Sequence, residues 1–454
     1  MEHKILFDNN IFSIPVGNYF GVQPSKCLLI YAPISKNFFL ANEKQVQELE
    51  VDLMNNKENP ILKSLLSKTE KDIQKSYPLK WNTLSTLYIL LNEKCNFNCS
   101  YCYSAKGRSK QELDINVLCS FIDCFMQPSP DTPQNRTLMF VGGGEPTLSW
   151  NAVKKATLYA EKIAQERDLI IKFRLSTNGS ILTHEMIDFY KDHKFALQIS
   201  YDVLPDVQSA QRDKWDIVDK NLKTLLSEHI SCNIRSTITD LNVTRMSEMV
   251  EFCKEHYPSI AGLELEPVVD AEKFKTPLQI HNFFSLYRES FLQAKKVANT
   301  NHIVLGTSTF ESIKQIRERF CYNLLCITPY NTLTLCPNVS SPLEKGYNEQ
   351  VFGSIKHDSI TGECTTNIDE EAFTRLTSNT IHTLPECKEC WAKWNCGGGC
   401  PDQRRVYSKE IREEICNYQR QALLDMLILT LAERYNNHSH SDFFADIKEK
   451  LQTD

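Results

Sequence analysis

From Leu87 to Cys102 the chain reads LYILLNEKCNFNCSYC, an apolar run followed by three closely spaced cysteines. The apolar residues Leu87–Leu91 predict a buried strand, so the cysteines lie on the loop that leaves it. Their Cys-x3-Cys-x2-Cys spacing supplies three thiolates within eight residues, at Cys95, Cys99 and Cys102. A four-iron cluster held by three thiolates keeps one iron open for another ligand. We therefore interpret the loop as an iron–sulfur site. Part of a zinc site, which normally has four closed ligands, is the alternative.

Strands and helices alternate around this loop, from about Thr83 to Asn299. The predicted strands are Leu84–Leu91, Thr137–Val141, Ile170–Leu175, Ala196–Tyr201, Asn233–Ile238 and Gly262–Val268, with helical patterns between them. Repeated βα units of this length imply parallel strands joined by right-handed crossovers. We therefore predict an α/β fold built on a partial (β/α)6 TIM-like barrel, with its chemistry at the carboxyl ends of the strands.

Polar and glycine-rich motifs follow the predicted strand ends. The second strand runs into Gly142-Gly143-Gly144-Glu145-Pro146, where glycines let the backbone approach a ligand and the carboxylate suits an amine. A tight βα turn is the alternative for this run alone. The third strand ends in Thr177-Asn178-Gly179, whose hydroxyl and amide groups suit ribose hydroxyls. Later strands contribute Ser200, Asp202, Arg212 and Arg235. Together these residues predict a ligand site at one edge of the sheet.

The bulk properties exclude several classes of function. A length of 454 residues suggests two or three domains. The formal charge of -6 is mild, with both signs interspersed, so we expect no nucleic-acid partner. No apolar run approaches the ~18 residues of a membrane span, and the N-terminus has no signal-peptide pattern. We therefore expect no membrane partner and a cytoplasmic protein. Thiols stay reduced there, and metal clusters explain 17 cysteines better than disulfides do.

The first 80 residues form a separate pattern. Cys27–Ala32 and Asn37–Leu40 predict two strands joined by a tight turn. Helices are predicted over Gln45–Met54 and Pro60–Lys75. This module is too small to house the chemistry, so we expect it to bind a partner.

Nine cysteines crowd the segment from Cys321 to Cys416. Four of them follow the spacing Cys387-x2-Cys390-x5-Cys396-x3-Cys400, and a zinc ribbon is the alternative for these four in isolation. Cys364 lies in what reads as a polar loop, and no role is assigned to it. A helix is predicted from Gln419 to Arg434, and the last residues are polar enough to predict a frayed tail.

Three of these motifs together resemble the radical S-adenosylmethionine (SAM) superfamily. They are the cysteine triad with Tyr101, the run Gly143-Gly144-Glu145-Pro146 and Thr177-Asn178-Gly179, and the resemblance covers roughly residues 83–300. It implies that Cys95, Cys99 and Cys102 bind a 4Fe–4S cluster, whose open iron is chelated by the amine and carboxylate of SAM. The other implied cofactor contacts are Gly143, Gly144 and Glu145 near the amine, Asn178 at the ribose, Ser200 and Arg212 around the carboxylate, and Tyr101 against the adenine.

The C-terminal cysteines are similar to the SPASM extension of radical enzymes. That resemblance implies two auxiliary 4Fe–4S clusters, which makes three clusters in all. The outer cluster would take Cys387, Cys390, Cys396 and Cys416, and the inner one Cys400, Cys336 and Cys321, with Cys326 a possible fourth ligand. Asn331 stands where the SPASM hairpin usually has glycine, and asparagine tolerates the positive φ of such a turn.

The resemblance also implies a division of labour. We expect a leader-recognition-like domain over residues 1–80, a radical SAM barrel over 81–305, a SPASM domain over 306–420, and a helix and tail over 421–454. The expected activity is that of a peptide maturase. A 5′-deoxyadenosyl radical would abstract hydrogen from a ribosomally made precursor peptide, giving a thioether or C–C cross-link or an altered Cα centre. The N-terminal module would hold part of this precursor, and flavodoxin or ferredoxin would supply electrons. No catalytic side chain is assigned.

Two alternatives remain open. An anaerobic sulfatase-maturating enzyme would make formylglycine, but its relatives carry an acidic residue after the cysteine that corresponds to Cys336. Here Pro337 follows instead. The other alternative is a non-catalytic iron–sulfur or zinc protein that relays electrons or acts as a scaffold. Glu145, Asn178 and Ser200 argue against it, because a relay has no need of those groups.

Overall fold

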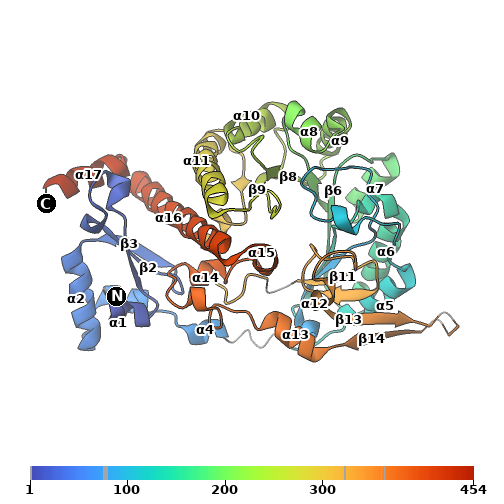
Figure 1. The fold of residues 1–454 in the computed structure, drawn as a ribbon, viewed down its shortest axis with the longest axis horizontal. Coiled ribbons are helices and arrows are strands. Elements are labelled where there is room, and N and C mark those ends of the chain that lie inside the picture. Colours follow the sequence, from blue (N-terminus) through green and yellow to red (C-terminus); the bar gives the residue numbers. More distant parts are fainter. Residues whose placement is uncertain (1–2, 75–79, 322–323, 359, 362, 454) are drawn as a thin grey trace.

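The structure is a computed structural model that describes residues 3–74, 80–321, 324–358, 360–361 and 363–453. The molecule is elongated, with the N-terminal unit at one end and the barrel at the other (Figure 1). Helices α14 (Lys393–Cys396), α15 (Pro401–Val406) and α16 (Lys409–Ser439) lie between these two parts, and α17 (Phe443–Thr453) lies beside the N-terminal unit. In the described part of the chain, no helix is long and apolar enough to cross a membrane.

A single eleven-stranded sheet forms the framework of the barrel part, in the order β10-β9-β8-β7-β6-β5-β4-β11-β12-β13-β14. Its central parallel strands are β4 (Thr86–Ile89), β5 (Asn135–Phe140), β6 (Ile170–Thr177), β7 (Ala196–Ser200), β8 (Cys232–Ile238) and β9 (Gly262–Pro267). These are the six strands predicted from the sequence, and each pairs with the next along the chain. The predicted α/β partial barrel is therefore confirmed.

The register of the strands brings their carboxyl ends to one edge. Ile89 lies opposite Phe140, Phe140 opposite Leu175, and Leu175 opposite Leu197, and all four side chains are buried. Side chains that alternate with this row point the other way, as exposed Arg174 does between buried Phe173 and Leu175. The loops after β4, β5, β6 and β7 consequently start side by side.

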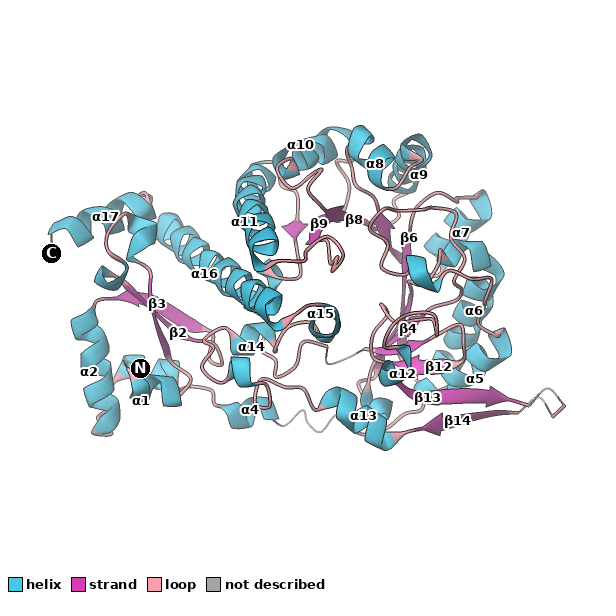
Figure 2. Cartoon of the chain, viewed as in Figure 1, coloured by secondary structure: helices cyan, strands magenta, loops and turns pink. Residues whose placement is uncertain are grey.

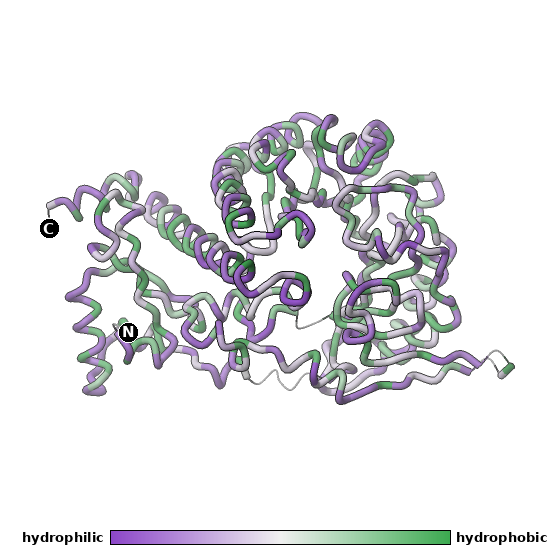
Figure 3. Tube along the Cα trace, viewed as in Figure 1, coloured by the Kyte–Doolittle hydropathy of each residue, from purple (hydrophilic) through white to green (hydrophobic). Residues whose placement is uncertain are grey.

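Helices cover the outer face of this sheet (Figure 2). They are α5 (Ile115–Phe125), α6 (Trp150–Glu166), α7 (His184–Asp192), α9 (Trp215–Ser227), α10 (Met246–His256) and α11 (Pro277–Thr300). Polar and apolar residues alternate along them (Figure 3), and their apolar sides join the main hydrophobic core. A short helix that the sequence analysis missed, α8 (Pro205–Gln211), precedes α9.

The cysteine-rich segment extends the same sheet. Strand β11 (Leu325–Ile327) pairs in parallel with β4, and β12 (Thr332–Thr334), β13 (Val351–His357) and β14 (Cys364–Ile368) follow antiparallel, while β10 (Leu305–Gly306) pairs with β9 at the other edge. Asn331 adopts a φ of 58° in the β11–β12 turn, so asparagine takes the positive φ of this turn as predicted. The polar-loop prediction for Cys364 is wrong: this residue begins β14 and lies opposite His357. The remaining helices of this segment are α12 (Tyr347–Gln350), α13 (Glu370–Thr377), α14 (Lys393–Cys396) and α15 (Pro401–Val406).

A three-stranded antiparallel sheet forms the N-terminal unit. The predicted hairpin is present as β2 (Leu28–Ala32) and β3 (Asn37–Ala41), and an unpredicted strand, β1 (Phe12–Pro15), pairs with β2. The order β1-β2-β3 leaves β3 at an edge. Two helices accompany the sheet, α1 (Lys4–Asp8) and α2 (Glu43–Met54).

The single helix predicted over Pro60–Lys75 is wrong. The structure has two short helices, α3 (Pro60–Leu65) and α4 (Glu70–Gln74), and Lys75 lies outside the described residues. The break follows from Thr69, whose backbone N–H and hydroxyl both donate to the Asp72 carboxylate, at 2.8 and 3.3 Å. Such side-chain bonds favour a new helix start over continuation of the old helix.

The frayed tail predicted at the C-terminus is also wrong. Helix α16 runs from Lys409 to Ser439 and is followed by α17 (Phe443–Thr453). Phe443 is buried, and its ring lies 5.7 Å from that of Phe20 in the N-terminal unit. A few aromatic residues in a polar tail are enough to dock it, because each buries a large apolar area.

Candidate active site

The three cysteines of the opening motif lie together on the loop after β4. Cys95, Cys99 and Cys102 are all half-buried, and the N–H of Cys102 donates to the carbonyl of Cys99 at 3.2 Å. Burial raises the pKa of Cys99, and the charge of Arg212 lowers it. Cys102 and Cys95 are close enough that their thiolate charges raise the same pKa. The structure therefore brings the three predicted ligands into one electrostatically coupled group.

The glycine-rich loop after β5 packs directly against this cysteine loop. The N–H of Gly144 donates to the Asn92 carbonyl and that of Glu145 to the Lys94 carbonyl, both at 2.7 Å. A Cβ atom on Gly144 would stand 1.9 Å from the Lys94 carbonyl oxygen, so no side chain fits there. Gly143 adopts a φ of 64°, which also favours glycine. The glycines thus permit close contact between the two loops, and their contact with a ligand stays a prediction.

The Glu145 carboxylate is 3% exposed and is held by four hydrogen bonds. The backbone N–H of Thr147 donates to it at 3.1 Å, and the Thr147 hydroxyl at 2.7 Å. The Thr177 hydroxyl and the Asn178 N–H, from the end of β6, each donate at 2.7 Å. Glu145 therefore ties the end of β5 to the end of β6. Its contact with a ligand amine stays a prediction.

Asn178 links the end of β6 to the cysteine loop. Its side-chain N–H donates to the Asn96 side-chain oxygen at 2.9 Å and approaches the Cys95 sulfur at 3.9 Å. Its side-chain oxygen accepts from the backbone and hydroxyl of Ser180, at 3.0 and 2.6 Å. The amide group is thereby held in one orientation beside the first cysteine.

Tyr101, Asp202 and Arg212 form a buried polar group beside the second and third cysteines. The Tyr101 hydroxyl donates to Asp202 at 2.6 Å, and Arg212 Nε donates to the same hydroxyl oxygen. The Arg212 guanidinium also stands 5.3 Å from the Tyr101 ring centroid and 3.4 Å from the Asp202 carboxylate. Burial raises the pKa of Tyr101 well above its ordinary value, so the phenol stays neutral. Ser200 ends β7, half-buried, opposite Arg235.

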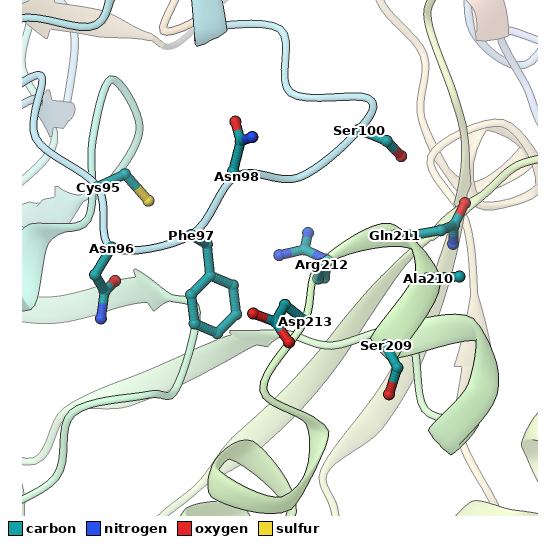
Figure 4. A pocket seen from close by; sticks show the side chains of 10 residues that line it. All are labelled: Cys95, Asn96, Phe97, Asn98, Ser100, Ser209, Ala210, Gln211, Arg212 and Asp213. Atoms are coloured by element: carbon teal, nitrogen blue, oxygen red, sulfur yellow. The ribbon is translucent and has the colours of Figure 1, made fainter.

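A cavity of about 490 Å³ adjoins the cysteine loop (Figure 4). Loop residues line one side of it and the end of α8 lines the other, and the lining comprises Cys95, Asn96, Phe97, Asn98, Ser100, Ser209, Ala210, Gln211, Arg212 and Asp213. Its volume is in the range of small-molecule sites. A thiol and a guanidinium therefore border one polar cavity.

Two further charged residues enter this region that the sequence analysis did not find. Arg108 donates from Nη1 to the Gly143 carbonyl at 2.9 Å and from Nη2 to the Cys102 sulfur at 3.1 Å. Glu93 is fully buried, and burial raises its pKa to about 7, although the Ser340 hydroxyl and the charge of Arg108 oppose the shift. Arg108 lies six residues after Cys102 and belongs to none of the motifs, so its spacing gave no signal. Glu93 stood in the quoted stretch, but nothing in the pattern marked it as buried.

Four C-terminal cysteines form a second coupled group. Burial raises the pKa of Cys396 to about 12, and the charges of Cys390, Cys416 and Cys387 raise it as well. The charges of Cys390 and Cys416 also raise the pKa of Cys387. These residues come from the segment around α14 and from α16, and they are the four predicted for the outer auxiliary cluster.

The third group comprises Cys321, Cys336 and Cys400. Burial raises the pKa of Cys336 well above its ordinary value, and the charges of Asp402, Cys400 and Cys321 act in the same direction. Cys326 lies on β11 opposite Tyr88, and among these cysteines only Cys321 influences its pKa. The four cysteines therefore share one region, with Cys326 at its margin.

The donor chemistry of these three groups suits iron–sulfur clusters. Each group is made of thiols alone, which is the usual ligand set of a cluster. The first group also has cationic and amide donors next to its sulfurs, from Arg108 and Asn178. In the described ranges, no three His, Cys, Asp or Glu side chains converge as tightly as a single metal ion requires. A cluster differs in that its own iron and sulfide atoms separate the thiolates.

Comparison with known proteins identifies the barrel part. Residues 89–253 match the family model described as the Radical SAM superfamily. A cysteine-type anaerobic sulfatase-maturating enzyme of Clostridium perfringens is 21% identical over 341 residues, which are 70% of this chain and 88% of that enzyme.

Two solved structures share the fold. The structure of anSMEcpe with bound AdoMet has a TM-score of 0.58 at 18% identity, covering 76% of this chain and 98% of that one. Streptococcus suis SuiB bound to precursor peptide SuiA has a TM-score of 0.51 at 13% identity, covering 88% of this chain and 97% of that one. At these identities the likeness concerns the fold alone.

Proposed function

The chain carries a radical SAM domain, and from this premise we propose that it is a maturase of a ribosomally made precursor peptide. A radical SAM domain implies a 4Fe–4S cluster and SAM as cofactors. The observation that carries the proposal is the meeting of Cys95, Cys99 and Cys102 with the glycine loop and Asn178 at neighbouring strand ends. An electron relay would need the thiols but not the other groups.

We infer that Cys95, Cys99 and Cys102 hold the cluster that binds SAM. When bound, this cluster supplies the electron that cleaves SAM to a 5′-deoxyadenosyl radical, which abstracts hydrogen from the substrate. The proposed SAM contacts are Tyr101, Gly143, Gly144, Glu145, Asn178, Ser200 and Arg212. The support for this set is its location, since these residues lie on the cysteine loop or follow the ends of β5, β6 and β7.

The chain's own residues shape this site before any cofactor binds. Glu145 fixes the ends of β5 and β6 relative to each other through its four hydrogen bonds. Arg212 places a positive charge beside Cys99, and that charge favours the thiolate needed for iron binding. Tyr101 stays protonated, and its hydroxyl donates a hydrogen bond to Asp202, which connects the cysteine loop to the end of β7. The site is thus organised by contacts between loops.

The N-terminal unit supports a peptide substrate. Strand β3 is an edge strand, and a cavity of about 350 Å³ beside it is lined by Asn37, Phe38, Phe39, Pro60, Ile61, Ser64 and Leu65. An edge strand can pair with an extended peptide through its backbone, while a neighbouring pocket takes side chains. SuiB, which shares the fold, was solved with a precursor peptide. We therefore propose that the precursor's leader segment binds between β3 and α3.

Two auxiliary 4Fe–4S clusters complete the proposal. The outer one would be held by Cys387, Cys390, Cys396 and Cys416, and the inner one by Cys321, Cys336 and Cys400 with Cys326 as a possible ligand. The mutual influence of these thiols on one another's pKa supports both groups. Flavodoxin or ferredoxin would be the external reductant.

Formation of formylglycine in a sulfatase is the second candidate function. The likeness to the Clostridium perfringens enzyme and to anSMEcpe favours it. Pro337 and Asn338 follow Cys336, so the position of the expected acidic base has no carboxylate. This difference ranks sulfatase maturation below precursor maturation.

The experiment that separates the two functions compares two peptides. The reconstituted protein is incubated with SAM, a reductant and either a sulfatase-type Cys peptide or the product of a short open reading frame beside its gene. Maturation of a precursor predicts a mass change only in the latter, provided its leader segment is present. Formylglycine in the sulfatase-type peptide would contradict the proposal.

A further inference from the structure

Arg108 bridges the cysteine loop and the glycine loop with a single side chain. Its Nη2 atom donates to the Cys102 sulfur at 3.1 Å, and its Nη1 atom donates to the Gly143 carbonyl at 2.9 Å. The side chain is half-buried. Two parallel N–H donors on one planar group fix the guanidinium in position, which a lysine ammonium would not do as well.

The bond to Cys102 differs from the other polar contacts made by cysteine sulfur. Asn178 approaches Cys95 at 3.9 Å, Ser104 lies 3.8 Å from Cys102, and Arg420 lies 3.9 Å from Cys390 in the outer group. The Arg108 contact is 0.7 Å shorter than the next of these, 3.8 minus 3.1 Å. Among the hydrogen bonds that described residues form with the sulfurs of Cys95 and Cys102, this one alone comes from a charged donor.

In the described part of the chain, the Arg108 guanidinium is not paired with a carboxylate. Among the described residues, no Asp or Glu oxygen forms an ion pair with its guanidinium, and its hydrogen bonds go to a sulfur and a carbonyl. Arg212, by comparison, lies 3.4 Å from Asp202. The charge of Arg108 also reaches the buried Glu93 carboxyl, whose pKa it lowers, but the hydrogen bond from Nη2 goes to Cys102.

We propose that Arg108 is a positioning residue that makes the initiating cluster easier to reduce, by donating a charge-assisted hydrogen bond to its Cys102 ligand. This inference rests on the proposed function, since it assumes that Cys102 is a ligand. Reduction adds one electron, and therefore one negative charge, to the cluster and its sulfurs. A cationic donor stabilises the more negative state, and hydrogen bonds to sulfur are among the factors that set cluster potentials. The effect is large in a half-buried site, where screening by water is weak.

The test is a redox titration of the reconstituted full-length protein, followed by the EPR signal of the reduced SAM-binding cluster. To isolate that cluster, the titration uses a background in which the outer and inner groups are removed by Cys416→Ala and Cys400→Ala. Arg108→Gln removes the charge and keeps a polar side chain. Arg108→Lys keeps the charge with a single donor. Lys106→Gln is the matched control, because Lys106 is exposed on the same loop and pairs with Glu272.

We expect a lower midpoint potential in Arg108→Gln, a smaller shift in Arg108→Lys and none in Lys106→Gln. Iron content and the EPR signal verify that each variant holds the cluster, so failure of the proposed function is seen as a missing signal in the parent protein. An unchanged or higher potential in a loaded Arg108→Gln protein would overturn the inference. If Arg108→Gln does not take up the cluster, the midpoint potential of Arg108→Lys is compared with that of the parent. An unchanged or higher potential in Arg108→Lys would then overturn the inference.

Discussion

The Oε2 atom of Glu145 accepts the backbone N–H of Asn178 at 2.7 Å, which joins the ends of two neighbouring parallel strands. Both residues are buried, with 3% and 6% of their surfaces exposed. Three further donors saturate the same carboxylate. Glu145 is therefore part of the framework of the site as well as a candidate ligand contact, and the framework role can be tested by stability.

Glu145→Gln is expected to lower the free energy of unfolding of the cofactor-free protein by about 1–3 kcal/mol, because a side-chain NH2 would face N–H and O–H donors. Urea unfolding followed by circular dichroism measures it. Glu185→Gln is the matched control, since Glu185 is an exposed partner of Lys154 and should cost little. Equal stability of the two variants would contradict the framework role.

The outer auxiliary cluster predicts a loss of metal in one variant and not in another. Cys416→Ala should remove about four iron atoms per reconstituted chain, because a whole cluster depends on its ligand set. Cys364→Ala should remove none, since Cys364 lies on β14 outside the three groups. Iron and sulfide analysis gives the answer, and equal iron content in both variants would refute the outer cluster.

The cavity beside β3 predicts a defect in peptide binding without a defect in chemistry. Ile61, 47% exposed in that cavity, becomes charged in Ile61→Asp, which should weaken precursor binding at least about tenfold. Fluorescence anisotropy of a labelled precursor measures the affinity, and SAM cleavage without peptide should be unchanged. Ile360→Asp, at a site 94% exposed, is the control. Equal affinities would place the peptide elsewhere.

Glu264, on the inner side of β9, predicts a pH-dependent stability. Burial raises its pKa above the ordinary 4.5, although Arg235, 3.2 Å away, opposes the shift. A raised carboxyl pKa means that the folded state holds its proton more tightly, so the contribution to stability fades as pH rises past 4.5. The melting temperature of Glu264→Gln relative to the parent should therefore be higher at about pH 8 than at about pH 5.

Glu228 supplies a control of opposite sign. Its pKa is lowered by Lys191, so its contribution is present at high pH and is lost on acidification. The melting temperature of Glu228→Gln relative to the parent should accordingly be lower at about pH 8 than at acidic pH. If raising the pH changed the relative melting temperatures of Glu264→Gln and Glu228→Gln in the same direction, the description of the Glu264 environment would be wrong.

The six barrel strands could be predicted because buried neighbours such as Ile89, Phe140 and Leu175 occur in short apolar runs between clear helical patterns. Strand β1 was not predicted because it has four residues, ends in Pro15 and gains its burial from β2. The break between α3 and α4 follows from two hydrogen bonds, from the backbone N–H and the hydroxyl of Thr69 to the Asp72 carboxylate, which hydrophobic periodicity does not register.

Some residues of the candidate site could likewise be predicted from the sequence, and others could not. Cysteines and glycines were recognisable because their spacing within one loop follows from local geometry. Arg108 was not, because its two partners are Cys102 on its own loop and Gly143 on another, 35 residues away. The engagement of Glu145 by Thr177 and Asn178 likewise exists only once β5 and β6 pair.

The central claim is that Cys95, Cys99 and Cys102 initiate SAM cleavage, and one measurement tests it most directly. The anaerobically reconstituted protein is incubated with SAM and dithionite, and 5′-deoxyadenosine is quantified by liquid chromatography. The account predicts 5′-deoxyadenosine from the parent and from Cys119→Ala, whose thiol lies half-buried on α5, and none from Cys95→Ala. No 5′-deoxyadenosine from a parent protein with intact clusters, or equal amounts from Cys95→Ala, would contradict it.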